Sequence, residues 1–213
     1  MSAAQRAQML QAWFSPGYPV GAFAYSHGLE WAIERREVAD AAALSDWIHT
    51  CLTEGSGWND AILLVQAAGD AAEVEALADL SNALSAGAER YREALDLGDA
   101  FARVTTAAWG RDVPAAPYPV AVGCAARVHG VPVEEIVPLY LHAFAANLVS
   151  VAVRLVPLGQ TDGQAVLAAT TSTIAEVADR AVRATLDDLG GLAQRADLAS
   201  LHHETQHVRL YRT

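Results

Sequence analysis

The chain has 213 residues, of which 53% are hydrophobic and 18% charged, and its formal net charge at pH 7 is −11. This composition allows a sizeable core and excludes general disorder, because disordered chains are poor in apolar residues. Such an acidic surface repels phosphate backbones and anionic membranes. We therefore expect neither nucleic acid nor a membrane as a partner. All 14 basic residues are arginines, which excludes a P-loop lysine and a Schiff-base amine.

The two cysteines, Cys51 and Cys124, lie in apolar stretches without CxxC spacing. This pattern predicts two reduced core thiols in place of a zinc site or a disulfide. Residues 1–14 lack the long apolar core of a signal peptide, so a cytoplasmic protein is expected.

Alanine and leucine dominate the long segments, which predicts an all-α fold with no sheet of consequence. After a loop at residues 15–19, the clearest helix follows Asp40, a good N-cap. Its apolar residues repeat at spacings of three and four and predict one buried stripe. The stripe consists of Leu44, Trp47, Ile48, Cys51 and Leu52.

A second helix is expected after Asp70, which has capping-box spacing with Glu73. A third is expected from about Ala88 to Trp109, interrupted at Gly98. Proline and glycine then predict breaks, which fall at residues 110–119, 130–132 and 157–163. Without an internal repeat or a strong boundary, residues 1–213 are expected to form a single compact domain.

Residues 137–156 are apolar enough to raise the question of a transmembrane helix. However, His142, Ser150 and Arg154 fall near one helical face. Burying an arginine in lipid costs on the order of 3 kcal/mol on insertion scales. We therefore expect a largely buried central helix of a water-exposed domain, with one polar seam.

Residues 203–207 match the zinc-binding pattern H-E-x-x-H. On a helix, His203 and His207 would share a face, with Glu204 as general base. The match lies almost at the end of the sequence, no third ligand has an identifiable setting, and three fixed positions match often by chance. A zinc hydrolase is therefore a remote alternative, and no metal or cofactor is predicted.

Residues 19–30 join a rigid loop to a helix, and Gly21 and Gly28 permit close backbone approach. Tyr25 and Ser26 can donate hydrogen bonds that Glu30 can accept. Ser26 and His27 are adjacent in sequence, which does not give nucleophile–base geometry, and no acid is placed to orient the histidine. These residues are therefore not a catalytic set. Two interpretations stay open: a loop packed under a helix, or a polar surface for a protein partner.

Residues 154–164 form the turn after the central helix. Arg154 at the end of an apolar helix can hydrogen-bond the terminal carbonyls, and Gln160 can bridge the turn. A phosphate loop is disfavoured because the lysine and the glycine spacing are missing. We assign Arg154, Gly159 and Gln160, with Gly21 and Gly28, to structure.

These stretches, taken in order, resemble the UreF family of urease accessory proteins. Residues 15–30 follow the family pattern S-P-x-x-P-x-G-A-F-x-Y-S-x-G-L-E, and residues 147–164 read NLVSVAVRLVPLGQTDGQ, close to the central family signature. Residues 203–213, HETQHVRLYRT, resemble the family ending H-E-x-Q-x-x-R-L-F-R-S. His207 stands where the family is commonly aromatic, so the zinc pattern looks accidental. Tyr91 and Ala94 depart from an arginine and a serine that are frequent in the family.

The resemblance implies an all-α, non-catalytic protein that acts as a chaperone in nickel insertion. It would bridge a UreD-type (UreH-type) accessory protein and the UreG-type GTPase, and so help GTP-dependent delivery of nickel to apo-urease, with a homodimer expected. It assigns Tyr25, Ser26 and Glu30 to a polar surface facing the GTPase. It assigns Arg209, Tyr211 and Arg212, in a flexible partner-binding tail of about residues 200–213, to the UreD-type protein.

A regulator that activates the partner GTPase is the alternative function. Such a protein can supply an arginine to its partner's active site. The candidates, by residue type alone, are Arg35, Arg36 and Arg127.

Overall fold

The computed structural model describes residues 1–69 and 73–213, and no strand is found among them. The all-α prediction is therefore confirmed. The α-helices are α1 (Ala3–Trp13), α2 (Leu29–Glu34), α3 (Ala41–Glu54), α4 (Ser56–Ala68), α5 (Val74–Ala83), α6 (Ala88–Trp109), α7 (Tyr118–His129), α8 (Val133–Leu155), α9 (Gln160–Ala169), α10 (Thr171–Arg183) and α11 (Gln194–His203). Two short 3₁₀-helices are η1 (Ala22–Ala24) and η2 (Leu186–Asp188).

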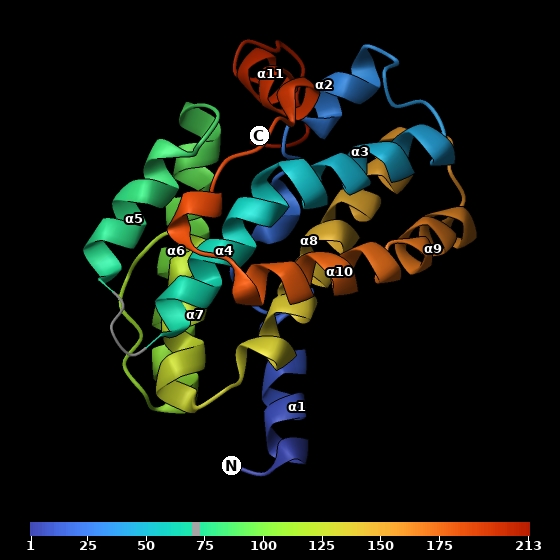
Figure 1. Ribbon diagram of the computed structural model, residues 1–213. Helices are drawn as coiled ribbons and strands as arrows, with labels where there is room; N and C mark the ends of the chain where they lie inside the picture. The colour runs from blue at the N-terminus through green and yellow to red at the C-terminus, as the bar shows by residue number, and fades with distance from the viewer. Residues whose placement is uncertain (70–72) are drawn as a thin grey trace.

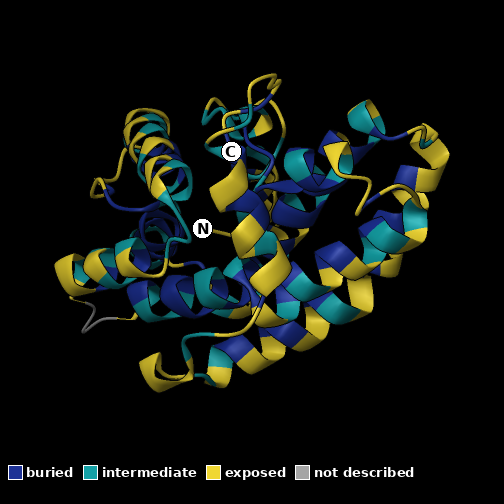
Figure 2. Ribbon diagram, turned by 90° about the horizontal axis from the view of Figure 1, so that it is seen from above, coloured by how far each residue is buried: buried dark blue, intermediate teal, exposed yellow. Residues whose placement is uncertain are grey.

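Helix α8 runs through the centre of the molecule (Figure 1). It packs against α2, α3, α4, α9 and α10. Its inward positions are fully buried, because they repeat every three or four residues and face these neighbours. They include Leu141, Ala145, Leu148 and Ala152. Figure 2 shows the same division in the surrounding helices, whose buried faces turn inward and exposed faces outward.

The outer face of α8 carries the predicted polar seam. His142, Ser150 and Arg154 are all exposed. The helix is long and apolar enough to cross a membrane, yet 56% of its most apolar window is buried inside the protein. The structure thus agrees with the prediction of a core helix.

Helix α3 begins as the sequence predicts. The Asp40 carboxylate accepts a hydrogen bond from the Ala43 N–H at 2.9 Å, which satisfies one unpaired donor of the first turn. The whole predicted stripe from Leu44 to Leu52 is buried. Helix α5 starts directly after Glu73, whereas Asp70 of the predicted capping box lies outside the described residues.

Helix α6 corrects the prediction that Gly98 interrupts it, because the helix continues unbroken to Trp109. Gly98 serves close packing instead. A Cβ at this position would lie 1.8 Å from the carbonyl oxygen of Ala116, so only glycine lets the segment before α7 cross α6 here. Gly98 is therefore required for a tertiary contact and does not end the helix.

Helices α4, α6 and α7 form a second packed group beside α8, with α7 lying against the other two. Cys51 in α3 and Cys124 in α7 are both buried and not disulfide-bonded, as predicted. Burial raises the pKa of the Cys51 thiol to about 12, so that thiol stays protonated at neutral pH.

Candidate functional site: the tail junction

The last residues of the chain pack between α2 and α6. We call this region the tail junction and define it as residues 25–30, 89–96 and 203–213. Figure 1 shows α11, α2 and the end of the chain together at one end of the molecule. After α11 ends at His203, the chain turns through hydrogen bonds from Thr205 N–H and Gln206 N–H to the carbonyls of His202 and His203. This turn directs the tail back across the protein.

Glu30 is the main anchor of the tail. It lies in the first turn of α2 and is only 6% exposed. Its carboxylate accepts hydrogen bonds from the backbone N–H groups of Leu210 at 2.7 Å and Tyr211 at 3.0 Å. Charge-assisted bonds of this kind are stronger than neutral ones, so one side chain fixes the path of the tail.

His203 connects the same carboxylate to α6. Its side chain is fully buried, with Nε2 3.1 Å from Glu30 and Nδ1 2.8 Å from a carboxylate oxygen of Glu89. Ionised carboxylates only accept hydrogen bonds, so both contacts are satisfied together when both ring nitrogens carry a proton. The guanidinium of Arg209 also contacts Glu89. Two carboxylates, an imidazole and a guanidinium are thereby brought together.

The end of the tail is enclosed. Thr213 is fully buried, and its carbonyl oxygen accepts hydrogen bonds from the Ser26 N–H at 2.9 Å and from the Ser26 hydroxyl. The Thr213 hydroxyl donates to Glu93 at 2.9 Å. These residues correct the expectation of a flexible tail, because its backbone and side chains are held by buried partners.

Glu93 is a second buried acid at the junction, 2% exposed. It contacts the Arg90 guanidinium and lies 3.1 Å from His27 Nε2. Burial, and secondarily the Arg90 charge, lowers the pKa of His27 well below its usual value. The neutral imidazole therefore donates its Nε2–H to Glu93, and the ion pair is Arg90–Glu93.

Tyr25 ties the junction to α8. Its hydroxyl donates to Asp96 at 3.2 Å, and its carbonyl accepts from the Asn147 side-chain amide at 2.9 Å. Beside it, the backbone N–H of Arg212 donates to the Ala24 carbonyl at 2.8 Å. The N-terminal, central and C-terminal sequence patterns therefore meet in one place.

The candidate residues differ in how much of them can touch a partner. Four are buried in this structure and lie under the surface: Tyr25, Ser26, Glu30 and Tyr211. Arg209 and Arg212 are exposed. Buried residues can influence a partner by positioning the tail, whereas the two arginines can contact it directly.

The glycine candidates play separate parts. Gly28 has φ +76°, and a Cβ there would lie 2.5 Å from the Ser200 nitrogen of α11, so it permits α2 and α11 to touch. Gly21 has φ +85° with open space around it. Gly159 precedes α9 with φ −68° and donates its N–H to Asp162 at 3.3 Å.

The turn after α8 lies apart from the junction. Arg154 and Gln160 are exposed, and within residues 1–69 and 73–213 no hydrogen bond joins Arg154 to the carbonyls at the end of α8. The turn is held instead by the Asp162 carboxylate at the start of α9. The polar clasp expected there is thus not formed by Arg154.

The H-E-x-x-H pattern does not form a zinc-binding helix face. His207 lies beyond the end of α11, and the two ring nitrogens of His203 face carboxylates. Glu204 instead accepts hydrogen bonds from the Ala88 and Glu89 N–H groups at 2.6 and 3.3 Å. It thereby caps the N-terminus of α6, where an anionic side chain is stabilising.

Sequence reasoning missed Glu89 and Glu93 as anchors. One signal was available: Glu93 shares a helical stripe with Leu97 and Phe101, which are four and eight residues further on and buried. A carboxylate on an otherwise apolar face predicts a buried polar contact. Nothing in the local sequence indicates that the contact is the end of the chain.

Comparison with known proteins shows the family of this chain. The family model UreF matches residues 38–171. Urease accessory protein UreF of Cereibacter sphaeroides is 55% identical over 201 residues, covering 94% of this chain and 95% of the relative. The protein of the same name from Roseobacter denitrificans is 49% identical over 208 residues, covering 96% and 92%. That from Rhodopseudomonas palustris BisA53 is 47% identical over 218 residues, covering 96% and 92%.

The class of protein is therefore a urease accessory protein. Within that class, the chain belongs to the UreF family.

Proposed function

We propose that this protein is a non-catalytic cytoplasmic scaffold that bridges a UreD-type (UreH-type) accessory protein and a UreG-type GTPase. The assembly would insert nickel into apo-urease in a GTP-dependent way, and the protein would work as a homodimer. The observation that carries the proposal is the family membership over nearly the whole chain. The tail junction supports it, because three separate sequence patterns meet there and hold the exposed residues of the tail in place.

The tail offers a defined outer face for the UreD-type protein. Val208 and Leu210 are 81% and 76% exposed, and Phe23 in η1 is 66% exposed. Arg209, between Val208 and Leu210, and Arg212, two residues after Leu210, are exposed as well. Arginine is enriched among interface hot spots, and apolar side chains exposed together on a surface are typical of protein interaction sites. Glu30 and Ser26 would act from beneath, by holding the backbone that presents these groups.

The test is co-expression with the UreD-type and UreG-type proteins, followed by size exclusion with light scattering. Arg212→Ala should weaken capture of the UreD-type protein roughly 30-fold or more, as expected for a hot spot of about 2 kcal/mol. Its backbone bond to Ala24 is unaffected by the change. The matched control is Arg103→Ala, an exposed arginine on α6. Full assembly by the Arg212 variant would refute this use of the tail.

The role of Glu30 toward the GTPase is tested in the same assay. Because Glu30 is buried, Glu30→Ala should reduce GTPase recruitment and urease activation through loss of the tail's position. Normal recruitment and activation would show that the junction does not serve the GTPase.

Regulation of the GTPase is a second candidate function, favoured by the exposure of two arginines at the end of α2. Arg36 is exposed and has φ +60°, while Arg35 lies 5.6 Å from the Trp31 ring centre. Arg127 instead donates to the Gly69 carbonyl at 3.0 Å. A GTP hydrolysis rate that falls with Arg36→Ala, while the complex still assembles, would support this activity.

A further inference from the structure

A cavity lies beside the tail junction, between α3, α4, α6 and α8. Its volume is about 240 Å³. Its mouth is marked by exposed residues of three segments: Glu54 at the end of α3, Leu84 after α5, and Gly191 before α11. An engineered cavity of about 150 Å³ in another protein holds benzene, so this space is large enough for a small organic molecule.

The cavity wall is acidic. Four carboxylates line it, from Glu54, Asp60, Glu93 and Asp197, against the one guanidinium of Arg90. Arg90 is already in contact with Glu93. Clefts lined by one sign of charge concentrate ligands of the opposite sign. The electrostatics therefore favour a cation.

Within the part of the chain that the structure describes, three of the four lining acids form no ion pair, and Asp60 is the least exposed of them: Glu54 and Asp197 are exposed, whereas Asp60 is half-buried. The Arg90 charge acts on Asp60, but from beyond ion-pair distance. The Asp60 carboxylate accepts one hydrogen bond, from the Tyr140 hydroxyl at 2.7 Å. Among the described residues, no ion pair involves Asp60. An ionised carboxylate held away from bulk water is costly unless a positive group compensates it. A ligand cation in the cavity would supply that compensation.

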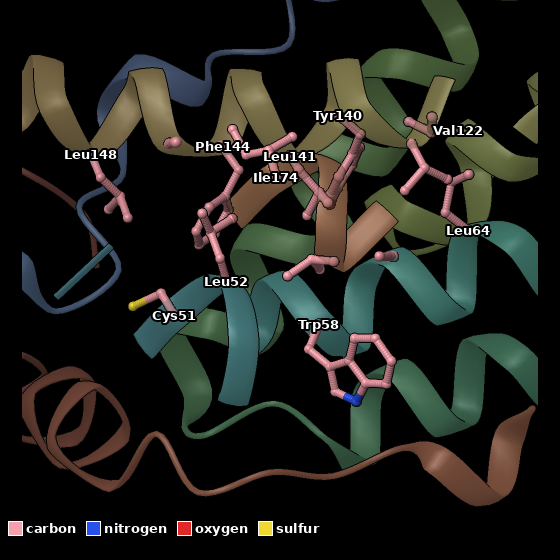
Figure 3. Packing of buried hydrophobic residues seen from close by; sticks show 14 of the residues in the cluster. Cys51, Leu52, Trp58, Leu64, Val122, Tyr140, Leu141, Phe144, Leu148 and Ile174 are labelled. Carbon is pink, nitrogen blue, oxygen red and sulfur yellow. The ribbon is translucent and has the colours of Figure 1, made fainter. Parts of the chain in front are cut away.

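Part of the remaining wall, on the side of α7 and α8, is apolar and aromatic. Tyr140 and Phe144 project from α8 toward α4, with Cys51 and Leu52 nearby (Figure 3). The rings of Tyr140 and Tyr118 lie with their centres 5.4 Å apart, and both line the cavity. Aromatic faces attract ammonium groups. The wall thus offers a carboxylate for a charge and rings for an apolar body.

A divalent metal ion fits this wall less well. Zinc takes about four ligands and calcium or magnesium about six or more. In the part of the chain that the structure describes, no three histidine, cysteine, aspartate or glutamate side chains converge as metal ligands. A single carboxylate with one neutral hydrogen bond suits an ammonium group, which needs no fixed coordination number.

We propose that this cavity is a binding site for a small organic amine, a primary ammonium on a short apolar body, with the Asp60 carboxylate as its counter-ion. The apolar body would lie against Tyr118, Tyr140 and Phe144. The site does not depend on the scaffold function, since it uses residues inside the protomer.

Binding should follow the protonation of Asp60. The titratable groups facing it are Tyr140 from α8, Tyr118 from α7, and Arg90 and Glu93 from α6. Burial raises the pKa of both tyrosines, so they stay neutral. Burial raises the pKa of Asp60 to about 6. Amine affinity should therefore fall as pH drops through 6, approaching tenfold per pH unit below it.

The test uses the full chain and two probes of equal shape, benzylamine and neutral benzyl alcohol. Backbone amide NMR shifts report both affinity and place, with shifts expected around Asp60 and Tyr140. Asp60→Asn keeps the size of the side chain and should weaken benzylamine binding at least tenfold at pH 7.5. It should leave benzyl alcohol binding unchanged, which shows that the cavity is intact. Asp46→Asn, an exposed aspartate on α3, is the matched control and should bind both probes normally.

Three outcomes would overturn the proposal. One is the absence of benzylamine shifts in the wild-type protein. Another is equal benzylamine affinity in the wild-type and Asp60→Asn proteins. The third is saturable nickel binding that requires Asp60, measured in a parallel titration, with no amine binding. Amine binding that needs Asp60 and disappears in acid would establish the site.

Discussion

At the scale of single residues, Glu30 connects the beginning of the chain to its end. It accepts two backbone hydrogen bonds from the tail and faces the imidazole of His203. Three donors therefore depend on one buried carboxylate. Removing it leaves the two tail N–H groups without an acceptor and leaves His203 with Glu89 as its one carboxylate partner, and an unpaired buried donor costs more than its bond contributes.

We predict that Glu30→Ala lowers the free energy of unfolding by about 2–6 kcal/mol, because two backbone N–H groups lose their acceptor at about 1–3 kcal/mol each. Hydrogen exchange should accelerate at the amides of Leu210 and Tyr211. Urea denaturation and exchange mass spectrometry measure the two effects. Glu34→Ala, which removes an exposed glutamate of the same helix, should change stability by less than about 0.5 kcal/mol. Equal effects of the two changes would contradict the role of Glu30.

Asp60 makes the free energy of unfolding depend on pH with the opposite sign to that of an acid in an ion pair. Burial raises its pKa to about 6, above the value of about 3.9 in an unfolded chain. Between these values the folded state holds a proton that the unfolded state has lost, so the free energy of unfolding falls as pH rises. At about 1.4 kcal/mol per pH unit, the raised pKa of Asp60 lowers the free energy of unfolding by at most roughly 3 kcal/mol. The true loss is smaller, because solvent entering the cavity screens part of the effect.

We predict that Asp60→Asn is more stable than the wild-type protein. Its advantage should grow by roughly 2 kcal/mol between pH 4 and 6, where the folded wild type keeps the Asp60 proton that the unfolded chain has lost, and should level off above pH 6. Urea denaturation at the two pH values measures this. A parallel pH dependence in both proteins would show that Asp60 does not titrate in this range.

At the scale of elements, close helix contact depends on glycine at Gly28 and Gly98. In both places backbone of another segment occupies the volume that a side chain would need. The sequence marks both residues as unusual, but it does not distinguish a chain break from a contact. Gly98 lies in mid-helix, and Gly28 precedes α2 in the left-handed region.

We predict that Gly28→Ala is much more damaging than Gly110→Ala. Both glycines have positive φ, +76° and +70°, but a Cβ at Gly110 meets nothing within 4 Å. Gly110→Ala should therefore lower the free energy of unfolding by only about 1–2 kcal/mol, the cost of placing alanine in the left-handed region. Gly28→Ala adds a clash with α11 and should also loosen the tail. Thermal unfolding and exchange at α11 report the difference, and equal losses would mean that α11 adjusts freely.

At the scale of the whole molecule, the core reaches from α1 to the tail as one cluster that includes Met9, Leu148 and Tyr211. Helix α1 is held on its inner side by Trp13, whose ring lies 5.5 Å from that of Phe101, edge to face. On its outer side, Arg6 pairs with Glu135 at 2.8 Å. Partly exposed ion pairs contribute little, whereas a buried indole contributes much.

We predict that Trp13→Ala destabilises the protein by about 3–5 kcal/mol, as for other buried aromatic residues. Arg6→Ala should cost less than about 1 kcal/mol. Chemical denaturation of the two variants tests which force attaches α1. A larger loss in the Arg6 variant would show that the ion pair dominates.

The sequence by itself determined the all-α class, the buried stripe of α3, the central helix α8 with its exposed polar seam, and the family. These follow from helical periodicity, capping chemistry and local motifs, which act between neighbours in the chain. Only the tertiary structure decided that Glu30 holds the tail and that Thr213 is buried, that α6 is crossed at Gly98, and that Asp60 faces a cavity. Such contacts join residues far apart in sequence, such as Glu30 and Leu210, whose numbers differ by 180, and local periodicity carries no information about them.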